Sequence, residues 1–186
     1  MPVTWSPCRP IHYVIDPTGA PADFAVQTSA VIAEISAATG FAFVNDGTMA
    51  EQASSSREPY QPDRYGDRWA PALIRFADAE AIPAFSTSVV GLGGPVSVRA
   101  PSGDGVPHYV SGFAYLDLDL LEAPGADGEP AYVGVLRHEL GHMLGLAHVD
   151  DPSQLMFEEA AEVRTFQNGD LAGLAALGDG PCAPDV

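Results

Sequence analysis

Residues 138–148 read His-Glu-Leu-Gly-His-Met-Leu-Gly-Leu-Ala-His, a segment that holds three of the five histidines of the chain. His138 and His142 are four residues apart, so on a helix both imidazoles project from one face and can share a metal ion. Gly145 is predicted to break that helix, because glycine accepts the positive φ of a sharp turn. The turn would bring His148 to the metal as a third ligand. Three protein ligands leave a fourth position open, which is typical of a catalytic zinc site rather than a structural one.

Glu139 directly follows the first of these histidines, and a carboxylate there has a chemical use. Zinc lowers the pKa of a bound water towards 7, and Glu139 would accept the proton of this water as it attacks a peptide carbonyl. Glu139 would then pass the proton to the leaving amine, while zinc carries the developing oxyanion charge. The alternative interpretation is that three unrelated histidines have this spacing by coincidence. This is disfavoured, because a pattern of this length arises by chance far less often than a short motif.

The segment resembles the HExxHxxGxxH motif of the metzincin zinc peptidases, which also carry a methionine turn beneath the metal. Residues 154–157 read Gln-Leu-Met-Phe, and Met156 is the candidate for that methionine. The triplet Leu-Met-Phe at residues 155–157 and the segment Gly-Asp-Leu at residues 169–171 most resemble the corresponding segments of small bacterial secreted matrixins. The resemblance covers mainly residues 138–177 and implies a zinc-dependent endopeptidase. One catalytic zinc is expected, because His108 stands alone where vertebrate matrixins hold a second, structural zinc.

The elements expected around this segment are strands and helices in mixed order, which predicts an α+β fold with a mixed sheet. Strands are predicted over residues 10–16, 41–44, 72–76, 91–100 and 109–118, and helices over residues 21–39, 131–146 and 169–177. Residues 49–68 are polar and are predicted to form a long surface loop. The proline in the strand at 91–100 suits an edge position. The resemblance implies that this edge pairs with an extended peptide substrate.

The resemblance also implies the division of the chain. A single catalytic domain over residues 1–186 would consist of an upper subdomain of about residues 1–147 and a smaller C-terminal subdomain of about residues 148–186. The twisted mixed sheet and the active-site helix would belong to the upper part. The substrate cleft would lie between the two parts.

The chain is strongly acidic, with 25 Asp and Glu against 8 basic residues, all of them arginine, and a formal net charge of −17. Such a charge repels phosphate groups, so nucleic acid and anionic membranes are not expected as partners. It also favours a soluble monomer. Calcium is a further candidate ligand for clustered carboxylates, although their spacing is not that of an EF-hand. The carboxylates considered for it are Asp117, Asp119, Asp150 and Asp151.

Cys8 and Cys182 lie near the two ends of the chain. Domain termini are often close together, so a disulfide between them is predicted, and it would stabilise the fold by about 4–5 kcal/mol. Such a bond needs an oxidising compartment, which indicates a secreted protein. The first residues lack the features of a signal peptide, so Met1 would open either a mature domain or a cytosolic protein. The alternatives for these cysteines are two reduced thiols, or a Cys8 that blocks the metal as the propeptide cysteine of matrixins does.

Three other functions stay open at this point. The enzyme could be a processing peptidase with one specific partner, which the sequence does not distinguish from a broad extracellular peptidase. A binding or zinc-storage module would need the histidines but not Glu139. A zinc hydrolase of non-peptide bonds is compatible with a short HExxH motif, but it is not expected for the long motif followed by Met156.

Overall fold

The computed structural model describes residues 3–99, 106–126, 128–158 and 163–184. Its strands are β1 (Ile11–Asp16), β2 (Phe43–Thr48), β3 (Ala72–Ala77), β4 (Gly91–Arg99) and β5 (Pro107–Asp117). Its helices are α1 (Phe24–Thr39), α2 (Pro62–Tyr65), α3 (Ala131–Leu144) and α4 (Asn168–Gly178), with short 3₁₀ turns η1 (Pro83–Ser86) and η2 (Leu118–Glu122).

The five strands form one sheet in the order β2-β1-β3-β5-β4. β4 runs antiparallel to β5, whereas every other neighbouring pair is parallel. This confirms the predicted mixed sheet and α+β fold, and it places β4 at the edge that the proline suggested. The alternation of side chains along each strand divides the core into two layers.

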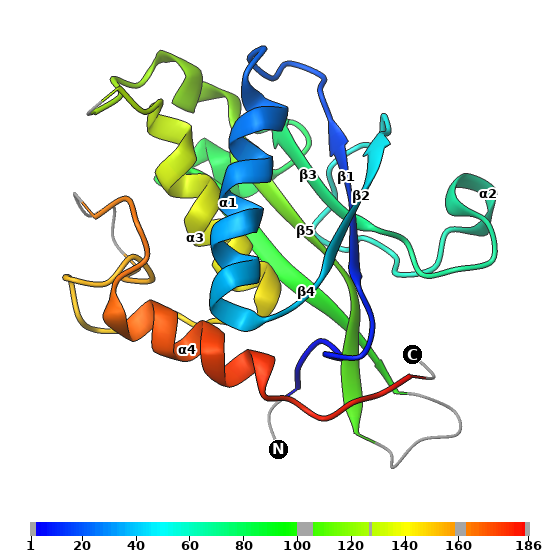
Figure 1. Cartoon of the computed structure of the whole chain (residues 1–186). Helices are drawn as coiled ribbons and strands as arrows, with labels where there is room; N and C mark the ends of the chain where they lie inside the picture. Colours follow the sequence, from blue (N-terminus) through cyan, green and yellow to red (C-terminus); the bar gives the residue numbers. More distant parts are fainter. Residues whose placement is uncertain (1–2, 100–105, 127, 159–162, 185–186) are drawn as a thin grey trace.

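One face of the sheet is covered by α1 and α3, which lie side by side across it (Figure 1). From β3, Ile74 and Phe76 are buried in the core beneath these helices. Leu73, one residue away, belongs to a second core on the opposite face, where residues 49–70 and η1 cover the sheet. The active-site segment therefore lies on the helical face, with β4 and β5 as its closest strands.

One predicted boundary and one predicted surface loop are wrong. β2 was expected to end at Val44, but it continues to Thr48, because its polar residues lie at the open side of an edge strand and Gly47 takes a φ of 93°. The segment 49–68 was expected to be a surface loop. It contains α2, and several of its side chains are buried, among them Ala53 and Tyr65.

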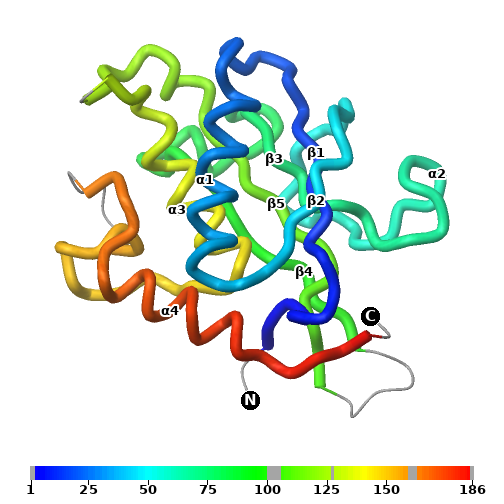
Figure 2. The backbone as a smooth tube through the Cα atoms, in the orientation of Figure 1, coloured from blue at the N-terminus to red at the C-terminus, as the bar shows by residue number. Residues whose placement is uncertain are grey.

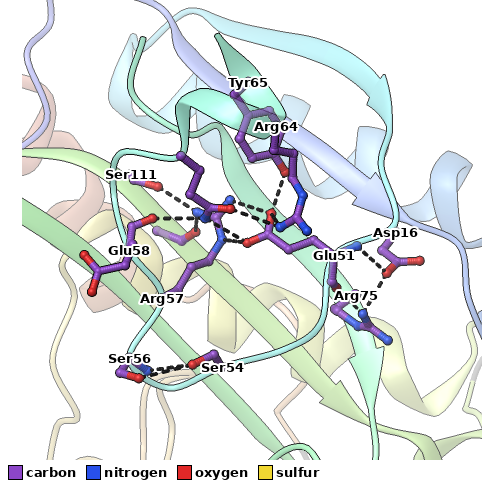
Figure 3. A network of polar contacts seen from close by, with 12 residues as sticks. Asp16, Glu51, Ser54, Ser56, Arg57, Glu58, Arg64, Tyr65, Arg75 and Ser111 are labelled. Atoms are coloured by element: carbon purple, nitrogen blue, oxygen red, sulfur yellow. Dashed lines mark hydrogen bonds and ion pairs between the residues drawn. The ribbon is translucent and has the colours of Figure 1, made fainter. Parts of the chain in front are cut away.

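A buried ion pair explains why this polar segment packs on the sheet. The Arg57 guanidinium donates to both carboxylate oxygens of Glu51, from Nε at 2.7 Å and from the second terminal nitrogen at 3.0 Å. Its other terminal nitrogen donates to the Ser111 hydroxyl at 2.8 Å and to the Gly112 carbonyl at 3.3 Å. Figure 3 shows these contacts converging between the loop and β5. The pair thereby ties residues 49–68 to β5, the strand that pairs with the edge strand β4.

The same network sets the protonation of its members. Burial alone would raise the pKa of Glu51, but hydrogen bonds from Arg57, Tyr65 and Gln61 lower it below its usual value. Burial, together with the hydrogen bond that its hydroxyl donates to Glu51, raises the pKa of Tyr65 to about 12. Glu51 is therefore an anion and Tyr65 a neutral donor near pH 7, which keeps every partner of this buried cluster satisfied.

The N-terminal segment and the segment that follows α4 lie side by side (Figure 2). Cys8 and Cys182 form a disulfide with a Cα–Cα distance of 5.4 Å, and the Ala183 N–H donates to the Ser6 hydroxyl at 2.9 Å. Trp5 donates its indole N–H to the carbonyl of Met143 in α3 at 3.0 Å. Because Cys8 is oxidised, it has no thiol with which to block the metal site.

Removing the disulfide is expected to destabilise the protein without changing its fold. The bond closes a loop between residues 174 positions apart, and the loop-entropy model gives a loss of about 4–5 kcal/mol. In a chain of this size, Cys8→Ser/Cys182→Ser should therefore lower the melting temperature by roughly 10–20 °C. Thermal unfolding with and without reductant measures this. Reductant should lower the wild-type midpoint and leave that of the double variant unchanged; equal wild-type midpoints would contradict the prediction.

Candidate active site

α3 carries the first two histidines on one face. Its apolar residues Leu136, Leu140 and Met143 are fully buried against the sheet and α1, so the opposite side of the helix is left for His138 and His142. Both histidines are only partly buried. Their ring centroids are 4.7 Å apart, as expected for two residues separated by four positions on a helix.

Backbone carbonyls hold both imidazoles in one tautomer. His138 Nδ1 lies 2.8 Å from the Leu155 carbonyl oxygen, and His142 Nδ1 lies 2.8 Å from the Leu146 carbonyl oxygen. A carbonyl only accepts, so in each ring Nδ1 carries the proton and Nε2 keeps its lone pair. This is the arrangement in which a histidine is ready to bind a metal through Nε2.

His148 completes the cluster. α3 ends at Leu144, and Gly145 follows with a φ of 114°, its N–H donating to the carbonyls of Gly141 and His142. The chain then reverses, and His148 Nε2 comes within 3.2 Å of His138 Nε2 and 3.0 Å of His142 Nε2. The turn that the glycine permits thus brings three ring nitrogens to one point.

The geometry of these nitrogens fits a zinc ion. Nitrogens bound at about 2.0–2.1 Å in a tetrahedral arrangement lie about 3.3 Å from one another, close to the separations found here. His138 and His142 both present lone pairs to this point, so the cluster lacks the donors for an ordinary hydrogen-bonded trio. Burial also lowers the pKa of both rings, that of His142 to about 4, which favours the neutral form that a metal requires.

Met156 packs against α3 between the two helical histidines. Its side chain is 1% exposed, and a Cβ added to Gly141, the residue before His142, would be 2.7 Å from its sulfur. The Met156 carbonyl accepts from the N–H of Val149, the residue after His148, at 3.0 Å. The methionine segment therefore supports both the helix and the loop that carry the histidines.

Asp170 is a residue of the site that the sequence did not reveal. Its buried carboxylate accepts the N–H groups of Leu155 at 2.8 Å, Met156 at 3.2 Å and Gln167 at 2.8 Å. Gln167 is the N-cap of α4 and forms a capping box with Asp170, so the helix begins at Asn168, one residue before the predicted start. The carboxylate thus fixes the segment whose Leu155 carbonyl orients His138. Two signals were available: the spacing of Gln167 and Asp170, which is weak outside the Ser/Thr pattern, and the Gly-Asp-Leu resemblance at residues 169–171, which gave Asp170 no role.

The side chain of Glu139 lies between α3 and β4, and the residue is 6% exposed. Burial raises its pKa to about 8, although a hydrogen bond from the Gly93 backbone N–H opposes the shift. A cation held by the neighbouring histidines would favour the carboxylate form. The Glu139 carboxylate is thus enclosed by protein, and in the sequence it directly follows His138.

Arg137, adjacent to His138, holds the other side of α3. Its guanidinium forms paired contacts of 2.9–3.0 Å with Glu34 of α1 and 2.9 Å with Glu129. It also donates to the Arg164 carbonyl at 3.2 Å. Arg137 therefore ties α3 to α1 and to the residues around Glu129 and Arg164.

The three histidines are the only group of three or more metal-capable side chains within the described ranges. Asp117 caps η2 by accepting from the Asp119 N–H, and Asp151 accepts from Ser153. The calcium suggestion therefore gains no support. His108 is buried in β5 and joins no such group.

A ligand helix broken at a left-handed glycine, a third histidine in the following loop and a methionine beneath them define the metzincin class of zinc peptidases. The family model described as Matrixin matches residues 72–177, more than half of the chain, and the chain belongs to the matrixin family. It is accordingly a zinc-dependent metallopeptidase with peptides or proteins as substrates. No curated protein matches the chain. Among the residues that the structure describes, no helix is both long enough and apolar enough to span a bilayer.

Proposed function

We propose that the protein is a secreted endopeptidase in which His138, His142 and His148 hold one zinc ion and Glu139 is the general base. The observation that carries this proposal is the convergence of three Nε2 atoms, two of them with lone pairs fixed by backbone carbonyls. Met156 supports the ligands from below, and Gly145 provides the turn to His148. The disulfide between Cys8 and Cys182 fits an oxidising, extracellular location.

Bound zinc would polarise the substrate carbonyl and make a water molecule nucleophilic near neutral pH. Glu139 accepts a proton from the attacking water and delivers it to the leaving nitrogen. Its enclosed position between α3 and β4 limits exchange with bulk solvent, so that proton stays at the reaction centre. His138 and His142 remain neutral, because burial disfavours the charged ring and each Nε2 lone pair would be bound to the metal.

The substrate is proposed to lie extended along the free edge of β4. This strand ends the sheet, so one side of its backbone is available for pairing, and Gly91 and Gly93 bring it against Glu139. The scissile bond would then lie between β4 and the histidine cluster. In this proposal the cleft divides a single domain into an upper subdomain of about residues 1–147 and a C-terminal subdomain of about residues 148–186.

Purified, metal-replete protein is expected to contain one zinc per chain and to cleave casein or a quenched generic peptide. A chelator should abolish cleavage, and added zinc should restore it, because the three histidines are the expected ligands. Elemental analysis and fluorescence measure the two quantities on one sample. Folded, metal-replete protein without zinc would contradict the proposal, whereas zinc with no cleavage of either substrate would favour a binding module or a narrow processing enzyme.

A further inference from the structure

Two glycines of β4 lie directly against Glu139. A Cβ added to Gly91 would be 2.4 Å from the Glu139 carboxylate oxygen Oε1 and 2.7 Å from both its Cδ and its Cγ. A Cβ added to Gly93 would be 2.2 Å from the backbone oxygen of Glu139 and 2.8 Å from its carbonyl carbon. The two glycines are two residues apart on a strand, so they present the same face to α3.

Space, not backbone conformation, is the reason for glycine at these positions. Neither Gly91 nor Gly93 has a positive φ, and both pair regularly with β5. The next glycine, Gly94, points to the opposite face of the sheet, where an added Cβ would meet only Phe113, at an ordinary 3.6 Å. The tight contacts are therefore confined to the face that touches Glu139.

The two contacts constrain different parts of Glu139. Gly93 touches the main chain of α3, so it sets how closely strand and helix approach. Gly91 touches only the side chain, so it sets where the carboxylate can lie. The Gly93 N–H also hydrogen-bonds the carboxylate, which gives the side chain one preferred direction along the strand.

We propose that Gly91 is a positioning residue for the catalytic carboxylate. Because residue 91 has no Cβ, the Glu139 side chain can lie against β4. Gly93 sets the distance between β4 and α3, and this distance defines the space for the side chain. The proposal rests on the proposed role of Glu139 as general base. A methyl group at residue 91 would displace the carboxylate while leaving the histidines in place. A displacement of about 1 Å is enough to lower a reaction rate about 100-fold.

The test is a double-mutant cycle with two readouts. In zinc-loaded protein, Gly91→Ala should lower the melting temperature by roughly 3–10 °C, since overpacking strains the contact. In the Glu139→Ala background the same substitution should change it little, because the atoms that it meets are gone. With Glu139 present, Gly91→Ala should lower kcat about 10–100-fold, with KM within about threefold and one zinc per chain.

Two neighbouring variants are the matched controls. Gly93→Ala should lower the melting temperature equally in both backgrounds, because it meets the backbone of residue 139. The effect of Gly94→Ala, whether large or small, should likewise not depend on residue 139. Glu139→Asp, which retracts the carboxylate by one methylene, should reduce the thermal cost of Gly91→Ala.

An equal thermal loss for Gly91→Ala with and without the Glu139 side chain would overturn the proposal. So would thermal coupling accompanied by an unchanged kcat, since the contact would then not position a reacting group. The failure of the proposed function is recognised separately: it appears as unchanged activity in Glu139→Gln, whatever the thermal cycle shows.

Discussion

Glu139→Gln is expected to lower kcat for peptide cleavage by about 10²–10⁴-fold while zinc remains at one per chain. General-base catalysis contributes an effect of this size, and the amide matches the carboxylate in shape, so the contacts with Gly91 and Gly93 persist. The buried amide also loses the ability to accept a proton. Steady-state kinetics with a quenched peptide and elemental analysis on the same preparation measure both quantities.

The control is Glu80→Gln, the same chemical change at an exposed position, which should leave kcat, zinc content and melting temperature unaltered. Near wild-type activity in Glu139→Gln would remove the residue from its proposed role. A loss of zinc together with activity would instead indicate that the residue acts on the ligands, and the mechanism would need another base.

Asp170→Ala is expected to lower the free energy of unfolding by about 3–5 kcal/mol, because three backbone N–H groups lose their acceptor and two of them are buried. The segment freed includes the Leu155 carbonyl that orients His138. Loss of a group that orients a metal ligand costs about 10–100-fold in metal affinity. Denaturant unfolding and a competitive zinc titration measure the two effects.

Asp170→Asn keeps one acceptor oxygen and should lose less stability than Asp170→Ala. Asp179→Ala is the matched control, because this exposed aspartate lies at the other end of α4, where a negative charge opposes the helix dipole. Its removal should be neutral or slightly stabilising. If Asp170→Ala were as stable as wild type, the carboxylate would not be what holds the methionine segment.

The centre of the site was predictable because its residues are close in the chain. The eleven residues from His138 to His148 contain the three clustered histidines, the proposed base and the turn, and helical geometry and one glycine suffice to bring the histidines together. The five strands and the three long helices were predictable for the same reason, because the spacing of apolar residues along each segment is a local pattern. The edge position of β4 was indicated by its proline.

The supports of the site were not predictable because they act across long separations. Asp170 meets Leu155 and Gly91 meets Glu139 only after α4 and β4 are in place, and no local pattern marks either contact. The burial of several side chains of residues 49–68 was missed for a related reason. A segment with Glu51 and Arg57 appears solvent-exposed until its charges pair with each other and with Ser111.

The open side of β4 also bears on how copies of this protein behave together in solution. A strand edge that is proposed to receive a peptide could equally receive the edge of another copy, which is a route to aggregation. Pro95 and Arg99 within β4 blunt that route, and the net charge of −17 keeps the molecules apart at neutral pH. Near the isoelectric point of about 4.3 this repulsion vanishes, and concentrated salt screens it. Colloidal stability of the enzyme therefore depends on its carboxylates remaining ionised.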